Sequence, residues 1–371
     1  MLKKVFTYSL LGFLLFSGLP LAQAQGGDSF TAKGEVLSVV RTEQVFAAEK
    51  LSLLVEPSKE LIEQDLEIKI LSGRDKGEVV TVKNILEGGP FDLELKAGDK
   101  VFLQGNLLAD DEVHYEIRDR WYLDGLIVIA VLVLILVLLL TGKKGLRALL
   151  GLLLSIAVIF LFFLPLLEKG YSPILLTLFT SLLITILSLL SILGKGKKSA
   201  VAFLGTLGGV ILALVLAYLA GIIFLRLNGL GTEDSMILAA NFTDYNFRGL
   251  LLAGFIIGAL GACMDVAVSI VAGLEEVAMH ATNVGSKELF RSGISIGRDI
   301  FGSMLNTLVF AYVGASLTLV ILLSKSQVDL VALFNYGFVA EEIVRSLVGA
   351  IGLLATIPVT AFVGANLFKK R

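Results

Sequence analysis

The sequence has little of what soluble catalytic sites and metal sites are built from. Its 371 residues include one cysteine and two histidines, and only 17% of them are charged. The single cysteine, Cys263, allows no intramolecular disulfide and gives no metal-ligand spacing. His114 and His280 both fall outside the long apolar runs described below. An intramembrane enzyme therefore lacks a credible nucleophile–base pair.

The motifs of common soluble enzymes are also missing. The chain contains no GxxxxGK[ST], no GxGxxG after a strand, no HExxH and no GxSxG. The glycine-rich string LGTLGG, at 204–209, lies within an apolar run, so we interpret it as helix packing and not as a phosphate loop. We expect no enzyme activity, no cofactor and no nucleic-acid partner.

Apolar residues are abundant instead, at 56% of the chain. Seven long apolar runs follow Trp121, and each has close to the ~20 residues that a helix needs to cross the hydrocarbon core. They cover 122–141, 146–166, 173–193, 200–225, 249–273, 300–323 and 344–366. The sequence therefore predicts a membrane all-α bundle of about seven transmembrane helices over 121–371, with the lipid bilayer as its first partner.

Basic residues predict how these helices are oriented. They concentrate in alternate connections, after the first and third runs and after the seventh, whereas the intervening loops are more acidic. Lysine and arginine favour the cytoplasmic side. We therefore expect a multi-pass protein of the bacterial cytoplasmic (inner) membrane with its C-terminus in the cytoplasm. Thr232, followed by Glu233 and Asp234, further predicts a short helix in the loop 226–248.

The N-terminal part of the chain differs in composition from the rest. Residues 1–24 have a basic start, a short apolar core and the sequence Ala22-Gln23-Ala24, which together are typical of a signal peptide. An uncleaved anchor helix is the alternative. Residues 26–118 alternate apolar and polar positions in short runs separated by turn signals. This segment is predicted to be a small extracytoplasmic β-barrel or β-sandwich domain.

One carboxylate, Asp265, lies deep in the fifth apolar run. It is 16 residues from Gly249, or about 24 Å along a helix. A charge in the bilayer core costs ~2.5–3.5 kcal/mol on insertion scales, and such residues usually face a bundle interior. Helical spacing places Ser269 and Glu276 on the same stripe as Asp265. We expect this stripe in the cytoplasmic half of the membrane.

The sixth run carries a matching polar stripe. It is expected to begin near Arg298, and helical spacing aligns Asp299, Ser303, Asn306 and Thr307 on one face. This stripe also falls in the cytoplasmic half, so the two polar faces are predicted to meet.

Two interpretations of Asp265 stay open. It either binds a cation or a proton during transport, or is held by Arg298, by Asn306 or by hydroxyls as a structural tie between helices. Arg298 and Asp299 are either a cytoplasmic gate or a pair at the start of a helix. Glu275 and Glu276 are secondary candidates, because the end of a helix is usually solvated.

Several strings resemble a known family. GALGACMDVAVSIVAGLEE and SGISIGRDIFGSMLNTLVFAYVGASL are similar to the core signature of the YibE/YibF family of bacterial membrane proteins. SGRDKGEVVTVKN and EEIVRSLVGAIGLLATIPVTAF resemble segments of the same family. The resemblance covers most of the chain after about residue 30. It implies a multi-span membrane protein and brings little biochemistry.

A weaker likeness of pattern concerns SecD/SecF and RND-type export proteins, which proton flow drives. Those proteins also have an Asp-containing span, a cytoplasmic loop and then an Arg followed by a polar span. The large paired extracytoplasmic domains of that group are absent from this sequence. This likeness implies proton coupling by analogy only.

The sequence thus predicts a secondary transporter or permease for an unknown small solute or ion, with proton-coupled export as the expected mode. The alternative is a membrane sensor or assembly component whose β domain binds an envelope partner. Glycine-rich helix faces would also permit a homodimer. The sequence specifies no metal.

Overall fold

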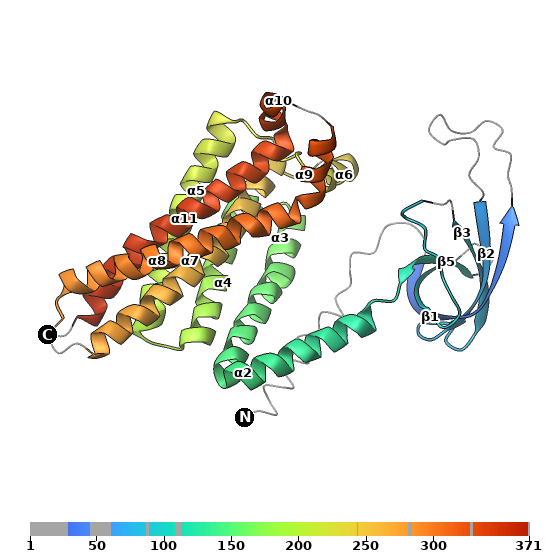
Figure 1. Ribbon diagram of the computed structural model, residues 1–371, viewed down its shortest axis with the longest axis horizontal. Coiled ribbons are helices and arrows are strands. Elements are labelled where there is room, and N and C mark those ends of the chain that lie inside the picture. The colour runs from blue at the N-terminus through green and yellow to red at the C-terminus, as the bar shows by residue number, and fades with distance from the viewer. Residues whose placement is uncertain are drawn as a thin grey trace. The chain divides into compact units, whose positions relative to one another are not determined.

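The computed structural model describes residues 29–44, 61–86, 89–107, 113–242, 244–280, 284–326 and 329–369 (Figure 1). The chain divides into two compact units, with the boundary between Leu139 and Leu140. Each unit is described by itself. The expected signal peptide, residues 1–24, lies outside the described residues.

The first unit contains one antiparallel sheet with strand order β3-β2-β1-β4-β5. The strands are β1 (Ser29–Gln44), β2 (Leu61–Ile70), β3 (Val79–Leu86), β4 (Lys100–Leu107) and β5 (Val113–Arg120). The sheet curls until its two edge strands, β3 and β5, contact each other, which makes a half-barrel. The expected antiparallel strands are confirmed. The described residues form a single curled sheet and not two stacked sheets.

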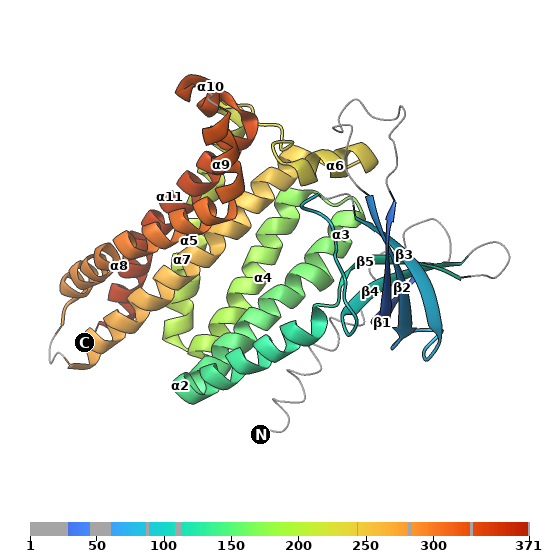
Figure 2. The ribbon, with the colours of Figure 1, turned by 45° about the vertical axis from the view of Figure 1, so that its right-hand side comes forward.

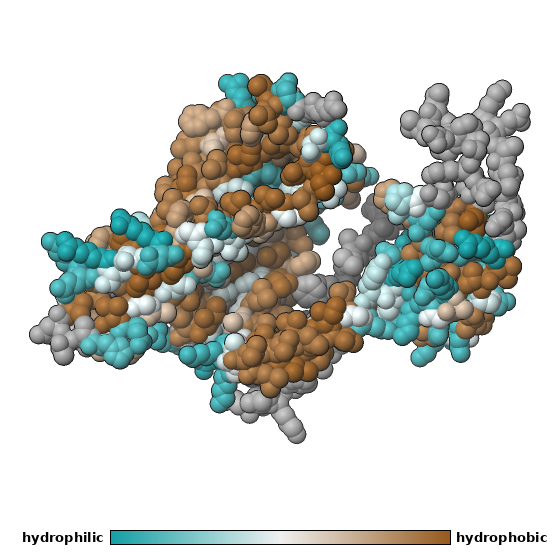
Figure 3. Space-filling model, viewed as in Figure 1, coloured by the Kyte–Doolittle hydropathy of each residue, from teal (hydrophilic) through white to brown (hydrophobic). Residues whose placement is uncertain are grey.

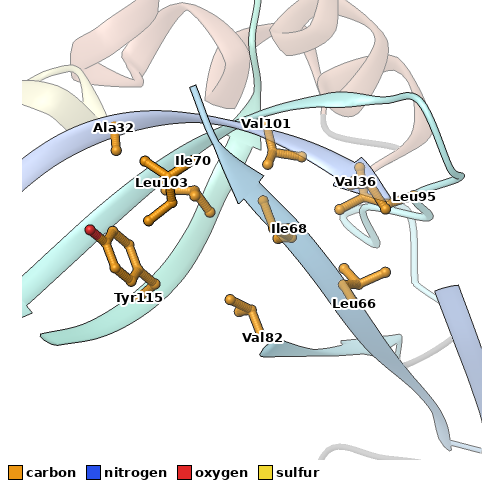
Figure 4. Packing of buried hydrophobic residues seen from close by; sticks show 10 residues of the cluster. All are labelled: Ala32, Val36, Leu66, Ile68, Ile70, Val82, Leu95, Val101, Leu103 and Tyr115. Carbon is orange, nitrogen blue, oxygen red and sulfur yellow. The ribbon is translucent and has the colours of Figure 1, made fainter. Parts of the chain in front are cut away.

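The concave face of this sheet holds the core of the first unit (Figure 4). Leu66, Ile68 and Ile70 alternate along β2 and are fully buried. Alternation works because successive side chains of a strand point to opposite faces. Gln64 continues this buried row, and its amide is satisfied by the backbone carbonyl of Leu95 and by Asn84.

Asp124 ties the sheet to the first helix. Its carboxylate accepts hydrogen bonds from Lys33 at 2.7 Å, from Lys100 at 3.2 Å and from the Trp121 indole at 3.0 Å. The Lys33 ammonium also lies 5.2 Å from the centre of the Trp121 ring. Strands β1 and β4 and the start of the helix are thus joined by a compact polar cluster.

That helix, α2 (Leu123–Val158), is interrupted at Gly142. Gly142 has φ 57° and ψ −135°, a conformation that L-residues rarely adopt. The chain continues through the π-helical turn η1 (Ile159–Phe163) into α3 (Leu164–Glu168). The first two expected spans therefore appear as one apolar segment of 46 residues with a break inside it.

Together with η1, α3 and the part of α2 after Leu139, the remaining helices form the second unit (Figure 2). They are α4 (Pro173–Leu193), α5 (Lys197–Ala217), η2 (Tyr218–Phe224), α6 (Glu233–Asn241), α7 (Phe247–His280), α8 (Ser286–Ala315), α9 (Leu317–Lys325), α10 (Leu330–Asn335) and α11 (Gly337–Phe368). Among the described residues, five helical segments are long and apolar enough to cross a membrane, or six if the bent pair α8–α9 is one span. The chain therefore has the helices of a membrane-embedded protein. The seven expected spans therefore do not appear as seven separate helices.

The closest helix packing in the second unit joins α5 to α11. A Cβ atom on Gly205 would overlap the Thr360 hydroxyl, and one on Gly209 would overlap that of Thr356. Only glycine lets the two backbones approach this far. The interpretation of 204–209 as a packing segment is confirmed.

Two local predictions have different outcomes. The short helix after Thr232 is confirmed as α6, whose first turn is held by reciprocal hydrogen bonds between Thr232 and Ser235. The sixth span differs from the prediction, because its helix begins at Ser286 and bends by 63° before α9. Its early part is amphipathic, with Leu289, Gly293 and Gly297 buried at four-residue spacing, and so it packs without being apolar throughout.

Candidate functional site

One narrow face of α7 carries Asp265. Gly254, Gly258, Gly261, Asp265 and Ala272 follow each other at three-, four- and seven-residue steps, so they lie on one side of the helix. The opposite side of α7 is fully buried against the bundle. Gly261 and Asp265 are exposed, whereas Gly254 and Gly258 are partly covered. The carboxylate therefore stands on an open face lined by residues without bulky side chains.

Asp265 has no hydrogen bond or ion pair among the interactions found in the described part of the chain. The expected ties to Arg298, to Asn306 or to hydroxyls are not formed in this structure. Ser269, one turn further along α7, is half-buried, and Glu276 continues the same stripe as an exposed side chain.

Helix α8 runs antiparallel beside this face. Near the His280 end of α7, Ile296 lies 2.8 Å from the point at which Gly273 would carry a Cβ atom. Near the Phe247 end, the Tyr312 hydroxyl lies 2.9 Å from the equivalent point on Gly258. Equal steps along both helices between these contacts place Asp265 at the level of Met304 and Leu305, between Ser303 and Asn306. The two predicted stripes therefore share one level of the bundle.

The polar residues of α8 are exposed at this level. Asp299, Ser303, Asn306 and Thr307 all lie on the open side of the helix. The Ser303 hydroxyl donates to the carbonyl of Ile300 and that of Thr307 to the carbonyl of Ser303, so both satisfy the backbone of their own helix. A band of pale and teal residues crosses the otherwise brown helices along α8 in Figure 3. The structure brings the two stripes to one level without joining them by a hydrogen bond.

Arg298 and Asp299 do not start a helix. Both lie in the middle of α8, twelve or more residues after Ser286, and both are exposed. That alternative is wrong because the preceding segment, although polar, is helical through its buried Leu289, Gly293 and Gly297.

The two secondary candidates have local partners. Glu275 pairs with Lys198 of α5, and Glu276 with His280 at 2.9 Å, one turn away on α7. Glu275 thus ties α7 to α5, whereas Glu276 makes an exposed contact within its own helix. Neither side chain bonds to Asp265.

A second polar cluster lies at the Phe247 end of the same α7 face, and the sequence analysis did not single it out. Arg345 of α11 pairs with Glu342 at 3.2 Å and lies 5.2 Å from the centre of the Phe255 ring. Tyr312 of α8 reaches Gly258 beside it. Glu342 and Arg345 lie at the start of the seventh apolar run, and the i,i+3 spacing of their opposite charges is a sequence signal for the pair. Nothing in the sequence indicates that Tyr312 approaches it.

Glu341, immediately before that pair, is buried. Its carboxylate accepts hydrogen bonds from the backbone amides of Gly229 and Gly231, in the connection between η2 and α6. A side chain at Gly231 would meet this carboxylate at 2.5 Å. The first turn of α11 is thus fastened to the 226–232 loop.

The described residues contain no group of three His, Cys, Asp or Glu side chains that could hold a metal ion. What the α7–α8 surface offers is one carboxylate with neutral hydroxyl and amide groups at its level. Such a set suits a proton or a weakly held cation better than a tightly coordinated metal.

Comparison with known protein families gives two matches along the chain. Residues 129–370 match the YibE/F-like protein family, and residues 32–119 match the YibE/F family N-terminal domain. No curated protein and no solved structure matches the chain. The first match alone covers more than half of the residues, and it includes the α7 and α8 segments whose motifs suggested the resemblance. The chain therefore belongs to the YibE/F-like protein family.

Proposed function

We propose that this protein is a secondary transporter or permease for a small solute or ion, working outward with proton coupling. The observation that supports this proposal best is Asp265, an exposed carboxylate without a partner on a glycine-lined face of an apolar helix. A charged side chain is costly in such a segment, so its retention there favours a functional role.

The neighbouring side chains fit a transport site around this carboxylate. Ser303, Asn306 and Thr307 provide neutral oxygen and nitrogen atoms at or near its level on α8, and Ser269 does so one turn away on α7. Protonation or cation binding would remove the charge of Asp265 and allow the open face to pack. Arg298 and Asp299, further toward the His280 end, would receive or release the transported species.

The proposed topology has seven crossings in the bacterial inner membrane. Two crossings fit the 46 residues of Leu123–Glu168, because one needs only ~20 residues and the helix breaks at Gly142. Lys143 and Lys144 follow the break and favour the cytoplasmic side. When α8 and α9 are counted as one span, the first unit, which contains the sheet, is extracytoplasmic. The C-terminus is then cytoplasmic.

Substitution of Asp265 tests the transport role. In proteoliposomes, Asp265→Asn should abolish solute-coupled proton flux, measured with an internal pH dye against a panel of candidate solutes. Asp265→Glu should retain part of it. Asp234→Asn, which removes an exposed carboxylate of α6, is the matched control and should behave as wild type. Wild-type flux in a correctly folded Asp265→Asn protein would refute the role.

A membrane sensor or assembly component is the second candidate. The polar cluster of Asp124, Lys33 and Trp121 favours it, since it connects the sheet firmly to the first apolar helix. A sheet that binds an envelope partner would pass a displacement directly to that helix. In this case Lys33→Met would prevent partner binding at the sheet from displacing the first helix. Asp265→Asn would leave that coupling between the sheet and the helix intact. Crosslinking of the sheet to an envelope protein, compared between the two variants, separates the candidates.

A further inference from the structure

The α7 face that carries Asp265 is covered at one end only. At the Phe247 end, Arg345 Nη1 lies 3.2 Å from the point at which Gly254 would carry a Cβ atom, and the Tyr312 hydroxyl lies 2.9 Å from that of Gly258. Three residues further on, nothing lies within 4 Å of the equivalent point on Gly261. Side chains from two other helices therefore lie across the face and stop before Asp265.

The covering side chains are held in place by specific contacts. Arg345 is fixed by the ion pair with Glu342 and by the face of Phe255. Its side chain is 24% exposed and that of Glu342 28% exposed, so the pair is partly sheltered. Hydrogen bonds to charged groups stabilise more than neutral ones do. The cover is thus stable, and it depends on few atoms.

Of the two helices that bring the cover together, α11 is packed on α7 through Val344 and Val348, which share a buried cluster with Leu252 and Phe255, and only the end of α8 is loosely held. Gly254 and Gly258 have no side chains to engage α8 or α11, and the buried residues of α8 end at Gly297, four turns before Tyr312. The helix then bends by 63° into α9 after Ala315. Tyr312 can therefore leave Gly258 without unpacking the core.

We infer that Tyr312 and the Arg345–Glu342 pair form a gate that closes the Phe247 end of the Asp265 face. The gate is closed when the Arg345 and Tyr312 side chains fill the space beside Gly254 and Gly258. It opens when the end of α8 moves away from α7 and takes Tyr312 with it. Gly254 is eleven residues from Asp265, or ~16 Å, about half the thickness of the hydrocarbon core. The gate is thus separate from the carboxylate that it protects. This inference rests on the proposed transport role of the face.

Thiol accessibility tests the gate without measuring transport. Gly261→Cys places a reporter in open space between the gate and Asp265, in full-length protein whose native cysteine is removed by Cys263→Ala. A membrane-impermeant maleimide is applied to vesicles of each orientation. Arg345→Gln should raise the labelling rate from the Phe247 side by about tenfold or more, as expected for the loss of one charged hydrogen bond. Labelling from the His280 side should not change.

Two further variants keep the test decisive if Arg345→Gln folds poorly. Tyr312→Ala removes the second part of the gate. Gly258→Ala keeps every gate residue and displaces only the Tyr312 hydroxyl, so it should also raise the rate. Arg248→Gln, an exposed arginine at the start of α7, is the matched control and should label as the parent does.

The two proposals fail separately. Equal labelling rates in the parent and in all three gate variants overturn the gate, even if Asp265→Asn abolishes flux. An equal increase from both sides overturns it as well, because that result reports loosened packing. Unchanged flux in Asp265→Asn overturns the transport role, even if labelling responds to Arg345→Gln.

Discussion

At the scale of single residues, charged side chains in this protein differ mainly in whether they have partners. Asp124 has three donors around it, and Glu341 has two backbone amides. Asp265 has none among the described residues. Spacing along the sequence predicted where Asp265 lies on its helix and which residues share its face. It did not predict partners, because these come from other helices whose register a single sequence does not specify.

Trp121 is the only tryptophan in the chain, so its fluorescence reports the Asp124 cluster directly. Lys33→Met removes the ammonium from the indole face and breaks the 2.7 Å bond to Asp124. We expect the Trp121 ring to become more mobile and more accessible to acrylamide quenching. Lys96→Gln, an exposed lysine elsewhere in the sheet unit, should leave quenching unchanged. Identical quenching in both variants would contradict a structural role for the cluster.

At the scale of elements, the strands were easier to predict than the ends of the helices. Alternation in segments such as Lys100–Leu107 is visible because one face of the strand is buried and the other is only partly covered. The start of α8 was misplaced by about twelve residues, since a hydropathy criterion misses a helix that packs through Leu289, Gly293 and Gly297. No proline or charged residue in the sequence beside Ala315 indicates the bend that follows it.

The α5–α11 interface should be the least tolerant of added volume. Gly209→Ala places a methyl group against the Thr356 hydroxyl and 2.7 Å from the carbonyl oxygen of Gly352. Overpacking of this kind costs ~1–3 kcal/mol. Gly302→Ala, on an open part of α8, is the matched control and should leave stability equal or slightly higher. Thermal unfolding of the purified protein in detergent, followed by circular dichroism, compares the two, and a Gly209→Ala protein as stable as wild type would refute the interface.

At the scale of the whole molecule, the seven-crossing topology makes a prediction about sides. Lys76→Cys in the sheet unit and Lys169→Cys after α3 should react with an impermeant thiol reagent from the same side of the membrane. Lys195→Cys, beyond α4, should react from the opposite side. If Leu123–Glu168 crossed only once, Lys76→Cys and Lys169→Cys would react from opposite sides. The buried Cys263 provides a low background for this comparison.

Composition and hydropathy were sufficient to predict a membrane bundle with a separate β unit. They were not sufficient to predict how many separate helices the apolar runs make. Gly142, with its positive φ, interrupts α2 where the sequence analysis placed a loop, and the structure keeps helical geometry on both sides of it. The sequence also did not predict that Tyr312, Arg345 and Gly254 lie close together, because they belong to three helices that meet only in the folded bundle.

The fastening of Glu341 to Gly229 and Gly231 has a consequence for reagents that would control this protein. Glu341 precedes Arg345 by one helical turn, so the loop and the Arg345–Glu342 pair are carried by the same rigid start of α11. An antibody fragment or nanobody that grips the 226–232 loop would therefore restrain that turn without touching the α7 face. Binders selected against this loop would act as conformational locks, and they would also enlarge a small membrane protein for single-particle imaging.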